Sequence, residues 1–334
     1  MAVTLPLPLS VAYGGREIQA LRSMEALRSL GVEVEPLNPW DPTRQYGLLH
    51  CFGTDGLWEV AARVRATGVK VVVSPVLVFG RSVSTFRAWA RVDRLVPMRT
   101  SFRYRRDLLR LAHAVIALTE TERRVLEEVY GVPASRCHVI PNGIDDVFRN
   151  ATAGGHPELG IGDGFVLCVG SIEERKGQRL VLRAAQRARR RIVFIGEVRQ
   201  DDPYGAAFVR DLKATDNVVW HRKLEAGSDA LAGVYAAADA LILASSAEGM
   251  PLVALEARAA GCPLILSDLP QLIEAFPGAT FVRHDDQEAL TRAIQALPRR
   301  TTRAGVPAPW SWPQVASELR RVYQSIAPEI VPIA

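Results

Sequence analysis

Cysteine and lysine are scarce in this chain. It has four cysteines in 334 residues, and none of them belongs to a CxxC pair or lies beside a histidine at metal-ligand spacing. We therefore expect reduced thiols and no structural zinc, as in a cytoplasmic protein. Lysine also occurs only four times, so the position of each lysine is informative.

Long apolar runs and targeting signals are missing as well. No uncharged apolar stretch is long enough to cross a bilayer. The apolar N-terminus carries Pro6 and Pro8 and has no basic leader, so we expect no secretion signal. No carboxylate pair of the DxD type stands out, and no repeat or low-complexity region competes with a globular layout.

Length and composition fit two globular domains. With 334 residues, 48% hydrophobic and 23% charged, the chain can form two cores of about 150 residues each. The glycine-rich polar stretch 150–164 predicts a linker, so we place the boundary between a first domain, 1–150, and a second domain, 151–312. Short apolar runs alternate with helical stretches in both halves, which predicts an α/β fold with doubly wound parallel sheets.

The positive charge is local. Residues 1–150 hold 20 Lys and Arg against 15 Asp and Glu, whereas the rest of the chain is balanced at 21 against 21. Segment 81–110 alone holds nine arginines against two aspartates, interleaved with aromatic residues. Such a segment predicts peripheral contact with anionic lipid or with a phosphorylated or lipid-linked acceptor. A solvated helix face beside an acceptor-side loop is the plainer explanation, because basic surface runs are common, and no nucleic-acid-binding module is recognisable.

The most informative stretch is 239–268. It reads as a buried strand at 240–244, a loop at 245–249 and a helix at 252–260. Pro251 suits the first helical position, and Gly249 suits the turn before it. Glu248 then stands in the loop, and Glu256 stands in the second helical turn.

The start of that helix suggests a ligand. Free backbone amides there attract phosphate, whereas the carboxylates of Glu248 and Glu256 are suited to hydroxyl groups. A nucleotide sugar carries both kinds of group. The plainer alternative is an ordinary βαβ unit with two solvated glutamates.

Two further loops follow predicted strands. Lys176 lies beside Gly177 in the loop between the strand 165–169 and a helix from 178, where an ammonium can neutralise a diphosphate held by helix-end amides. A surface position is nevertheless the default for a lysine. Gly14 and Gly15 follow the first strand, where they serve either a tight turn or a close approach to ligand.

These stretches resemble a known family. The sequence EGMPLVALEA, with two glutamates separated by seven residues, and the following AGCPLILSD resemble the donor-site signature of the retaining glycosyltransferases of family four. YGGREIQALRSMEALRSLGVEV, GSIEERKG and PWSWPQVASELRRVYQSI resemble the family's opening segment, phosphate-clamp loop and closing helix. The resemblance implies the GT-B fold, in which two Rossmann-like domains face each other across a cleft and the helix 313–327 packs back on the first.

The resemblance also implies a function. Family members transfer a sugar, with retention, from a nucleotide diphosphate sugar to an acceptor hydroxyl on a glycan, a lipid-linked molecule or a small molecule, without a metal or other cofactor. Lys176 and Glu248 are then the catalytic candidates, with Glu256 on the ribose. The implied donor-binding residues are Gly15, Arg175, Lys176, Glu248, Gly249, Met250, Pro251, Leu252, Val253 and Glu256.

Two positions depart from the family pattern. Ser171 stands where an arginine commonly follows the first glycine of the clamp loop, and Ser74 and Pro75 stand near the place of a usual histidine. Because of these departures, two alternatives stay open. One is a non-catalytic subunit that binds nucleotide sugars, and the other is a sugar-nucleotide epimerase on the same fold.

Overall fold

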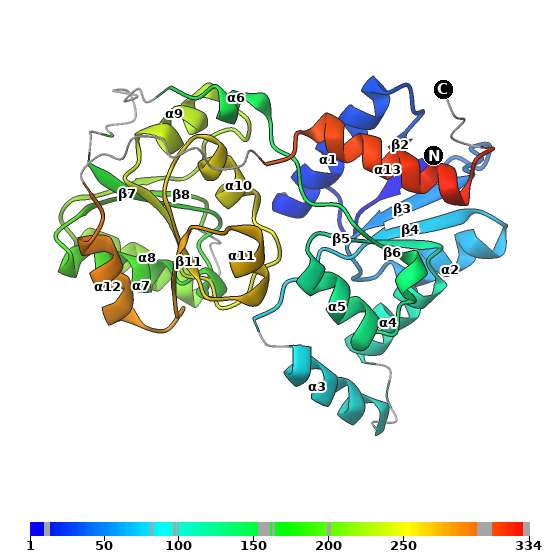
Figure 1. The fold of residues 1–334 in the computed structure, drawn as a ribbon, viewed down its shortest axis with the longest axis horizontal. Helices are drawn as coiled ribbons and strands as arrows, with labels where there is room; N and C mark the ends of the chain where they lie inside the picture. The colour runs from blue at the N-terminus through cyan, green and yellow to red at the C-terminus, as the bar shows by residue number, and fades with distance from the viewer. Residues whose placement is uncertain are drawn as a thin grey trace. The chain divides into compact units, whose positions relative to one another are not determined.

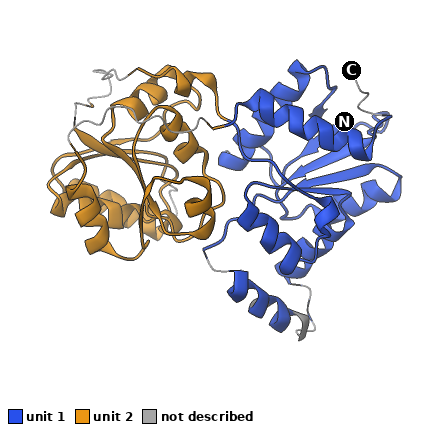
Figure 2. Ribbon diagram, viewed as in Figure 1, with its two compact units in different colours: residues 1–143, 310–334 blue, residues 144–309 orange. Residues whose placement is uncertain are grey.

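The chain folds into two compact units. A computed structural model describes residues 1–9, 14–80, 83–95, 98, 100–152, 161, 164–198, 202–298 and 309–329. Unit 1 comprises Met1–Gly143 with Trp310–Ala334, and unit 2 comprises Ile144–Pro309 (Figure 2). The expected boundary at 150/151 therefore falls inside unit 2, just after α6 (Asp146–Arg149). Most of the predicted linker 150–164 lies outside the described residues.

Unit 1 is built on a parallel sheet in the order β2-β1-β3-β4-β5-β6. Its strands are β1 (Ala2–Thr4), β2 (Glu35–Pro36), β3 (Leu48–Phe52), β4 (Lys70–Ser74), β5 (Ala114–Ala117) and β6 (Cys137–Val139). Its helices are α1 (Gly15–Ser29), α2 (Trp58–Ala66), α3 (Val83–Leu95), α4 (Ser101–Leu111), α5 (Glu120–Glu128) and α13 (Trp312–Ile326). The C-terminal α13 packs against α1, although the two are far apart in the sequence (Figure 1).

Two inner strands of unit 1 are completely buried. Every residue of β3 and of β5 is buried, as expected for a parallel sheet with helices on both faces. β1 ends at Thr4, although the mainly apolar sequence continues to Leu9. It lies between β2 and β3, where Pro6 and Pro8 have no N–H to donate to a neighbouring strand.

Unit 2 repeats this architecture in the order β12-β11-β10-β7-β8-β9, again with parallel pairing. Its strands are β7 (Phe165–Val169), β8 (Arg191–Ile195), β9 (Val218–His221), β10 (Ala240–Leu243), β11 (Leu264–Ser267) and β12 (Thr280–Val282). Besides α6, its helices are α7 (Gln178–Arg187), α8 (Pro203–Lys213), α9 (Asp229–Ala237), α10 (Leu252–Ala259), α11 (Pro270–Ala275) and α12 (Gln287–Gln295). Helices α7, α8 and α12 cover one face of the sheet, and α6, α9 and α10 cover the other (Figure 1). The predicted pair of doubly wound parallel sheets is confirmed.

The strand order of unit 2 positions a site. From β7 the chain runs outward through β8 and β9, and then returns to the other side of β7 as β10. In open parallel sheets, ligands bind at the carboxyl ends of the strands where the order reverses in this way. The loops that follow β7 and β10 therefore meet at this point, and they carry Lys176 and Glu248.

The arginine-rich segment 81–110 forms α3 and α4. Several of its arginines form ion pairs within unit 1: Arg87 lies 3.2 Å from Glu128, and Arg105 lies 3.5 Å from Asp55. Outside the described residues lie Arg81, Arg99 and the side chain of Arg94. Part of the charge expected to face a ligand or membrane is therefore balanced within the unit. None of the described helices has the length and apolar character needed to cross a bilayer.

Candidate functional site

The two loops at the switch point of unit 2 are in direct contact. The first contains the short 3-10 helix η3 (Glu174–Lys176), and the second runs from 244 to 251. The Ser246 amide donates to the Arg175 carbonyl at 2.8 Å. Gly177 has φ +67, and a Cβ at this position would lie 2.5 Å from the Ala244 carbonyl oxygen. Glycine at 177 therefore permits both the left-handed turn and the close approach of the loops.

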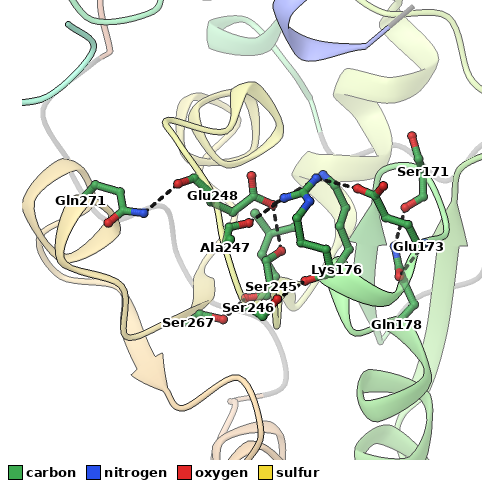
Figure 3. A network of polar contacts seen from close by, with 12 residues as sticks. Ser171, Glu173, Lys176, Gln178, Ser245, Ser246, Ala247, Glu248, Ser267 and Gln271 are labelled. Atoms are coloured by element: carbon green, nitrogen blue, oxygen red, sulfur yellow. Dashed lines mark hydrogen bonds and ion pairs between the residues drawn. The ribbon is translucent and has the colours of Figure 1, made fainter. Parts of the chain in front are cut away.

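Glu248 lies in the second loop, as predicted, and its carboxylate is largely buried at 6% exposure. The Ser245 hydroxyl donates to Oε1 at 2.8 Å, and the ammonium of Lys176 lies 3.6 Å from the same oxygen (Figure 3). The buried Gln271 donates its side-chain N–H to the main-chain carbonyl of Glu248 at 2.7 Å. Both the carboxylate and the backbone of Glu248 are thus held in place.

Lys176 is enclosed by its own loop. Its side chain is 16% exposed. A Cβ on Gly170, which has φ +137, would lie 3.0 Å from the Lys176 ammonium, so the glycine makes room for the side chain. The buried Gln178 donates to the Ser171 carbonyl at 2.7 Å and fixes the loop on the other side (Figure 3). Lys176 is therefore a positioned cation rather than a freely moving surface lysine.

Arg175 also lies at this point. Its guanidinium donates to the Ala247 carbonyl at 2.6 Å and to Glu173 at 2.5 Å, and it lies 3.2 Å from Oε1 of Glu248. The structure thus brings together Arg175, Lys176 and Glu248, which the sequence predicted to share a site. It also shows that Arg175 contacts both loops.

The start of α10 differs in one detail from the prediction. Pro251 is the residue that precedes the first helical residue, Leu252, and it has an extended backbone with ψ 123. The first-turn amides of Leu252 and Val253 have no carbonyl four residues earlier within the helix, so they are available to an acceptor. Gly249 and Met250 are half-buried in the loop directly before this turn.

Glu256 lies in the second turn of α10 and is 8% exposed. The Tyr235 hydroxyl on α9 donates to Oε2 of Glu256 at 3.0 Å. Burial, together with the nearby Glu256 charge, raises the pKa of Tyr235 well above its usual value, so the hydroxyl remains a donor. The sequence did not reveal Tyr235, Ser245 or Gln271 as parts of this site, because no local pattern marks their contacts.

Gly15, the remaining predicted site residue, lies in unit 1, as do His50 and Ser74. Gly15 is the first residue of α1, and a Cβ there would have nothing within 4 Å, so packing does not require glycine. His50 is completely buried in β3: its Nδ1 lies 2.7 Å from the Tyr323 hydroxyl, and its Nε2 lies 2.9 Å from the Ser74 hydroxyl. Ser74 therefore supports His50 instead of facing a ligand.

The arrangement in unit 2 combines groups for an anion with groups for hydroxyls. A positioned ammonium and the first-turn amides of a helix suit a phosphate, and two largely buried carboxylates suit hydroxyl donors. Among the described residues, no three His, Cys, Asp or Glu side chains gather closely enough to hold a metal ion.

Two family models match the chain. The model described as "Glycosyl transferases group 1" matches residues 164–299, which include both loops of the site. The model described as "Glycosyltransferase Family 4" matches residues 37–148.

Curated relatives carry a related name. The chain is 31% identical over 186 residues to a D-inositol 3-phosphate glycosyltransferase of Acidothermus cellulolyticus, a match that covers 51% of this chain and 41% of that protein. It is 28% identical over 288 residues to a protein of the same name from Arthrobacter sp., covering 79% of this chain and 65% of the relative. The chain thus spans less than two thirds of the length of these relatives.

Solved structures agree over nearly the full length. A sucrose-phosphate synthase from Thermosynechococcus elongatus aligns with a TM-score of 0.76 at 18% identity, covering 97% of this chain and 98% of that one. HepE of Anabaena, solved with UDP and glucose, aligns with a TM-score of 0.70 at 17% identity over the whole of both chains. These similarities confirm the GT-B fold. The two family models match residues 37–148 to glycosyltransferase family 4 and residues 164–299 to glycosyl transferases group 1.

Proposed function

We propose that the chain is a glycosyltransferase that moves a sugar from a nucleotide diphosphate sugar to an acceptor hydroxyl with retention of configuration. The observation that carries this proposal is the pairing of Lys176 and Glu248, 3.6 Å apart, at the switch point of unit 2 and directly before α10. This is the place where a parallel sheet binds ligands. The matches to the group 1 and family 4 models support both the reaction and its retention.

Each group has a role in this reaction. As the bond to the sugar breaks, negative charge grows on the leaving diphosphate, which Lys176 and the amides of Leu252 and Val253 stabilise. Glu248 accepts hydrogen bonds from sugar hydroxyls, and Glu256, oriented by Tyr235, binds the ribose. The Gly15 amide in unit 1 is a further proposed donor contact. The acceptor proton passes to the leaving phosphate oxygen, so no separate side-chain base is needed. We also propose that no metal or other cofactor takes part.

A phosphorylated small molecule is the acceptor class that we favour. Relatives are named for D-inositol 3-phosphate, and a structural neighbour is a sucrose-phosphate synthase. The balance of 20 basic to 15 acidic residues in 1–150 suits an anionic acceptor. A direct check compares transfer to inositol 3-phosphate and glucose 6-phosphate with transfer to the unphosphorylated compounds, which should be poorer acceptors.

A lipid-linked or glycan acceptor, with peripheral membrane contact through 81–110, is a second proposal. The nine arginines of this segment support it. Co-sedimentation with vesicles tests it: equal binding to neutral and anionic vesicles would count against the membrane contact.

The donor is found by a thermal-shift screen with UDP, GDP, ADP and their sugars, because a ligand of the folded state raises the apparent melting temperature. Transfer assays with the stabilising donor follow, with and without acceptor. Formation of a glycoside with the donor's anomeric configuration supports the proposal. Binding without turnover would favour the non-catalytic subunit suggested by Ser171 and Pro75, and interconversion of donors without acceptor would favour the epimerase.

A further inference from the structure

Arg175 joins the two loops of the site through both its backbone and its side chain. Its carbonyl accepts from the amide of Ser246 at 2.8 Å and from the hydroxyl of Ser246 at 3.3 Å. From the same residue, the guanidinium reaches the Ala247 carbonyl at 2.6 Å. The loop after β7 is thus fastened to the loop after β10 just ahead of Glu248.

The guanidinium is also committed to two carboxylates. One terminal nitrogen, Nη2, donates to Glu173 at 2.5 Å, and the other, Nη1, lies 3.2 Å from Oε1 of Glu248. A planar guanidinium with its donors in a fixed fork can serve several acceptors at once, which a lysine ammonium on a flexible stem cannot reproduce in the same geometry. Both terminal nitrogens of Arg175 therefore already face oxygen atoms of the protein.

We propose that Arg175 is a positioning residue: it orients the carboxylate of Glu248 and holds the loop 245–248 before α10, instead of binding the leaving diphosphate. This inference rests on the proposed glycosyl transfer. Of the side chains in η3, only that of Lys176 then contacts the diphosphate directly.

The charges explain why two adjacent cations have separate roles. Glu173 and Glu248 both lie against Arg175, and Lys176 lies farther from Glu248, at 3.6 Å. Since Arg175 lies closer to the Glu248 carboxylate than Lys176 does, the Lys176 charge remains available to an incoming diphosphate. Without Arg175, Glu248 would draw Lys176 toward itself, and the carboxylate would lose one of the contacts that set its direction.

The test is Arg175→Lys, which keeps the charge and removes the fork. If Arg175 positions Glu248, kcat of this variant should fall by about tenfold or more. The Kd for the nucleoside diphosphate should stay within about threefold of the wild-type value, because the lost interaction acts on the sugar and not on the diphosphate. Ser245→Ala removes another donor to the same Glu248 oxygen and should show the same pattern. Arg179→Lys is the matched control, since Arg179 pairs with Asp211 on α8, 2.7 Å away, and contacts no predicted donor-binding residue.

A double-mutant cycle adds a readout that a general loss of structure would not reproduce. In a Glu248→Gln background, Arg175→Lys should cause little further loss of kcat, because both changes remove the same interaction. Three results would each overturn the inference. They are an unchanged kcat in Arg175→Lys, a Kd for the nucleoside diphosphate that rises about tenfold while kcat is retained, and losses of kcat that multiply fully in the double variant. A wild-type chain that binds nucleotide but transfers no sugar would instead overturn the proposed function, and the inference with it.

Discussion

The two oxygen atoms of the Glu248 carboxylate have different surroundings. Ser245, Arg175 and Lys176 all approach Oε1, and among the described residues no hydrogen bond or ion pair involves Oε2. A carboxylate fixed through one oxygen presents the other in a defined direction. Oε2 is thus the atom that we expect to accept a hydroxyl of the donor sugar.

The two glutamates of the motif should therefore respond differently to substitution. Glu256→Ala should weaken nucleotide binding, whereas Glu248→Ala should mainly lower kcat, each by roughly tenfold to a hundredfold, the scale of one charged hydrogen bond. Titration calorimetry with the nucleoside diphosphate and steady-state kinetics separate the two effects. Unchanged binding and kinetics in both variants would refute the site.

Lys176 should matter more than any other lysine in the chain. Lys176→Ala should lower kcat/KM by an amount equivalent to about 3 kcal/mol, the effect of removing one donor that stabilises developing charge in an enclosed site. Lys213→Ala, an exposed position at the end of α8, is the control and should leave kcat/KM unchanged. Equal effects of the two substitutions would show that the charge of Lys176 has no special place in the reaction.

At the scale of the element, local sequence patterns were sufficient to predict the strand β10 and the helix α10. The strand was predicted at 240–244 and is observed at Ala240–Leu243, and the helix was predicted at 252–260 and is observed at Leu252–Ala259. A short buried run, a Gly and Pro break and a helical composition all lie within a few residues of each other. The hydrogen bond from Arg175 to Ala247 joins residues that are 72 positions apart. No local pattern could therefore indicate that the Arg175 guanidinium binds the second loop.

The meeting of the two loops depends on Gly177, and a matched pair of substitutions tests this. Gly164 and Gly177 have similar φ values of +74 and +67, but a Cβ at 164 meets nothing within 4 Å, whereas one at 177 would lie 2.5 Å from Ala244 O. Gly164→Ala should cost about 1 kcal/mol of unfolding free energy for backbone strain alone. Gly177→Ala should cost about 3 kcal/mol, because overpacking adds to the strain.

Urea unfolding of both variants provides the measurement. If the two substitutions cost the same, the close contact between the loops makes no contribution to stability. The variant at 177 should also lose transfer activity, since it separates Lys176 from Glu248.

At the scale of the whole molecule, long-range contacts decide what the sequence could not. His50 and Tyr323 are 273 residues apart, yet they hydrogen bond in the core of unit 1 and join α13 to the sheet. Resemblance to a family suggested where the last helix packs, but no feature of either residue indicated this partner. His50 lies inside β3, which has a neighbouring strand on each side.

This buried histidine predicts a pH dependence of stability. Burial lowers the pKa of His50 from 6.5 to about 3, so between these values the unfolded chain binds a proton that the folded chain does not. The contribution of the neutral His50 to the free energy of unfolding is therefore fully present above pH 6.5 and is lost as the pH drops toward 3. The loss between pH 7 and pH 5 should be about 2 kcal/mol from this one group.

Urea unfolding of unit 1 at the two pH values checks the prediction. His50→Gln should lower the free energy of unfolding at pH 7. It should also reduce the difference in this free energy between pH 7 and pH 5 by about 2 kcal/mol. The same substitution at His221, on β9 of unit 2, should leave the pH dependence of the unit 1 transition unchanged. An equally steep pH dependence in His50→Gln would assign the effect to other groups.

The division of the chain has a consequence for its synthesis. Unit 2 is a single continuous segment, 144–309, whereas unit 1 needs both 1–143 and the helix that begins at Trp312. On the ribosome, the strands of unit 1 are translated first but must wait for Tyr323 before His50 gains its partner. Synthesis of unit 2 thus begins after most of unit 1 has been made, yet all segments of unit 2 are available before the last helix of unit 1.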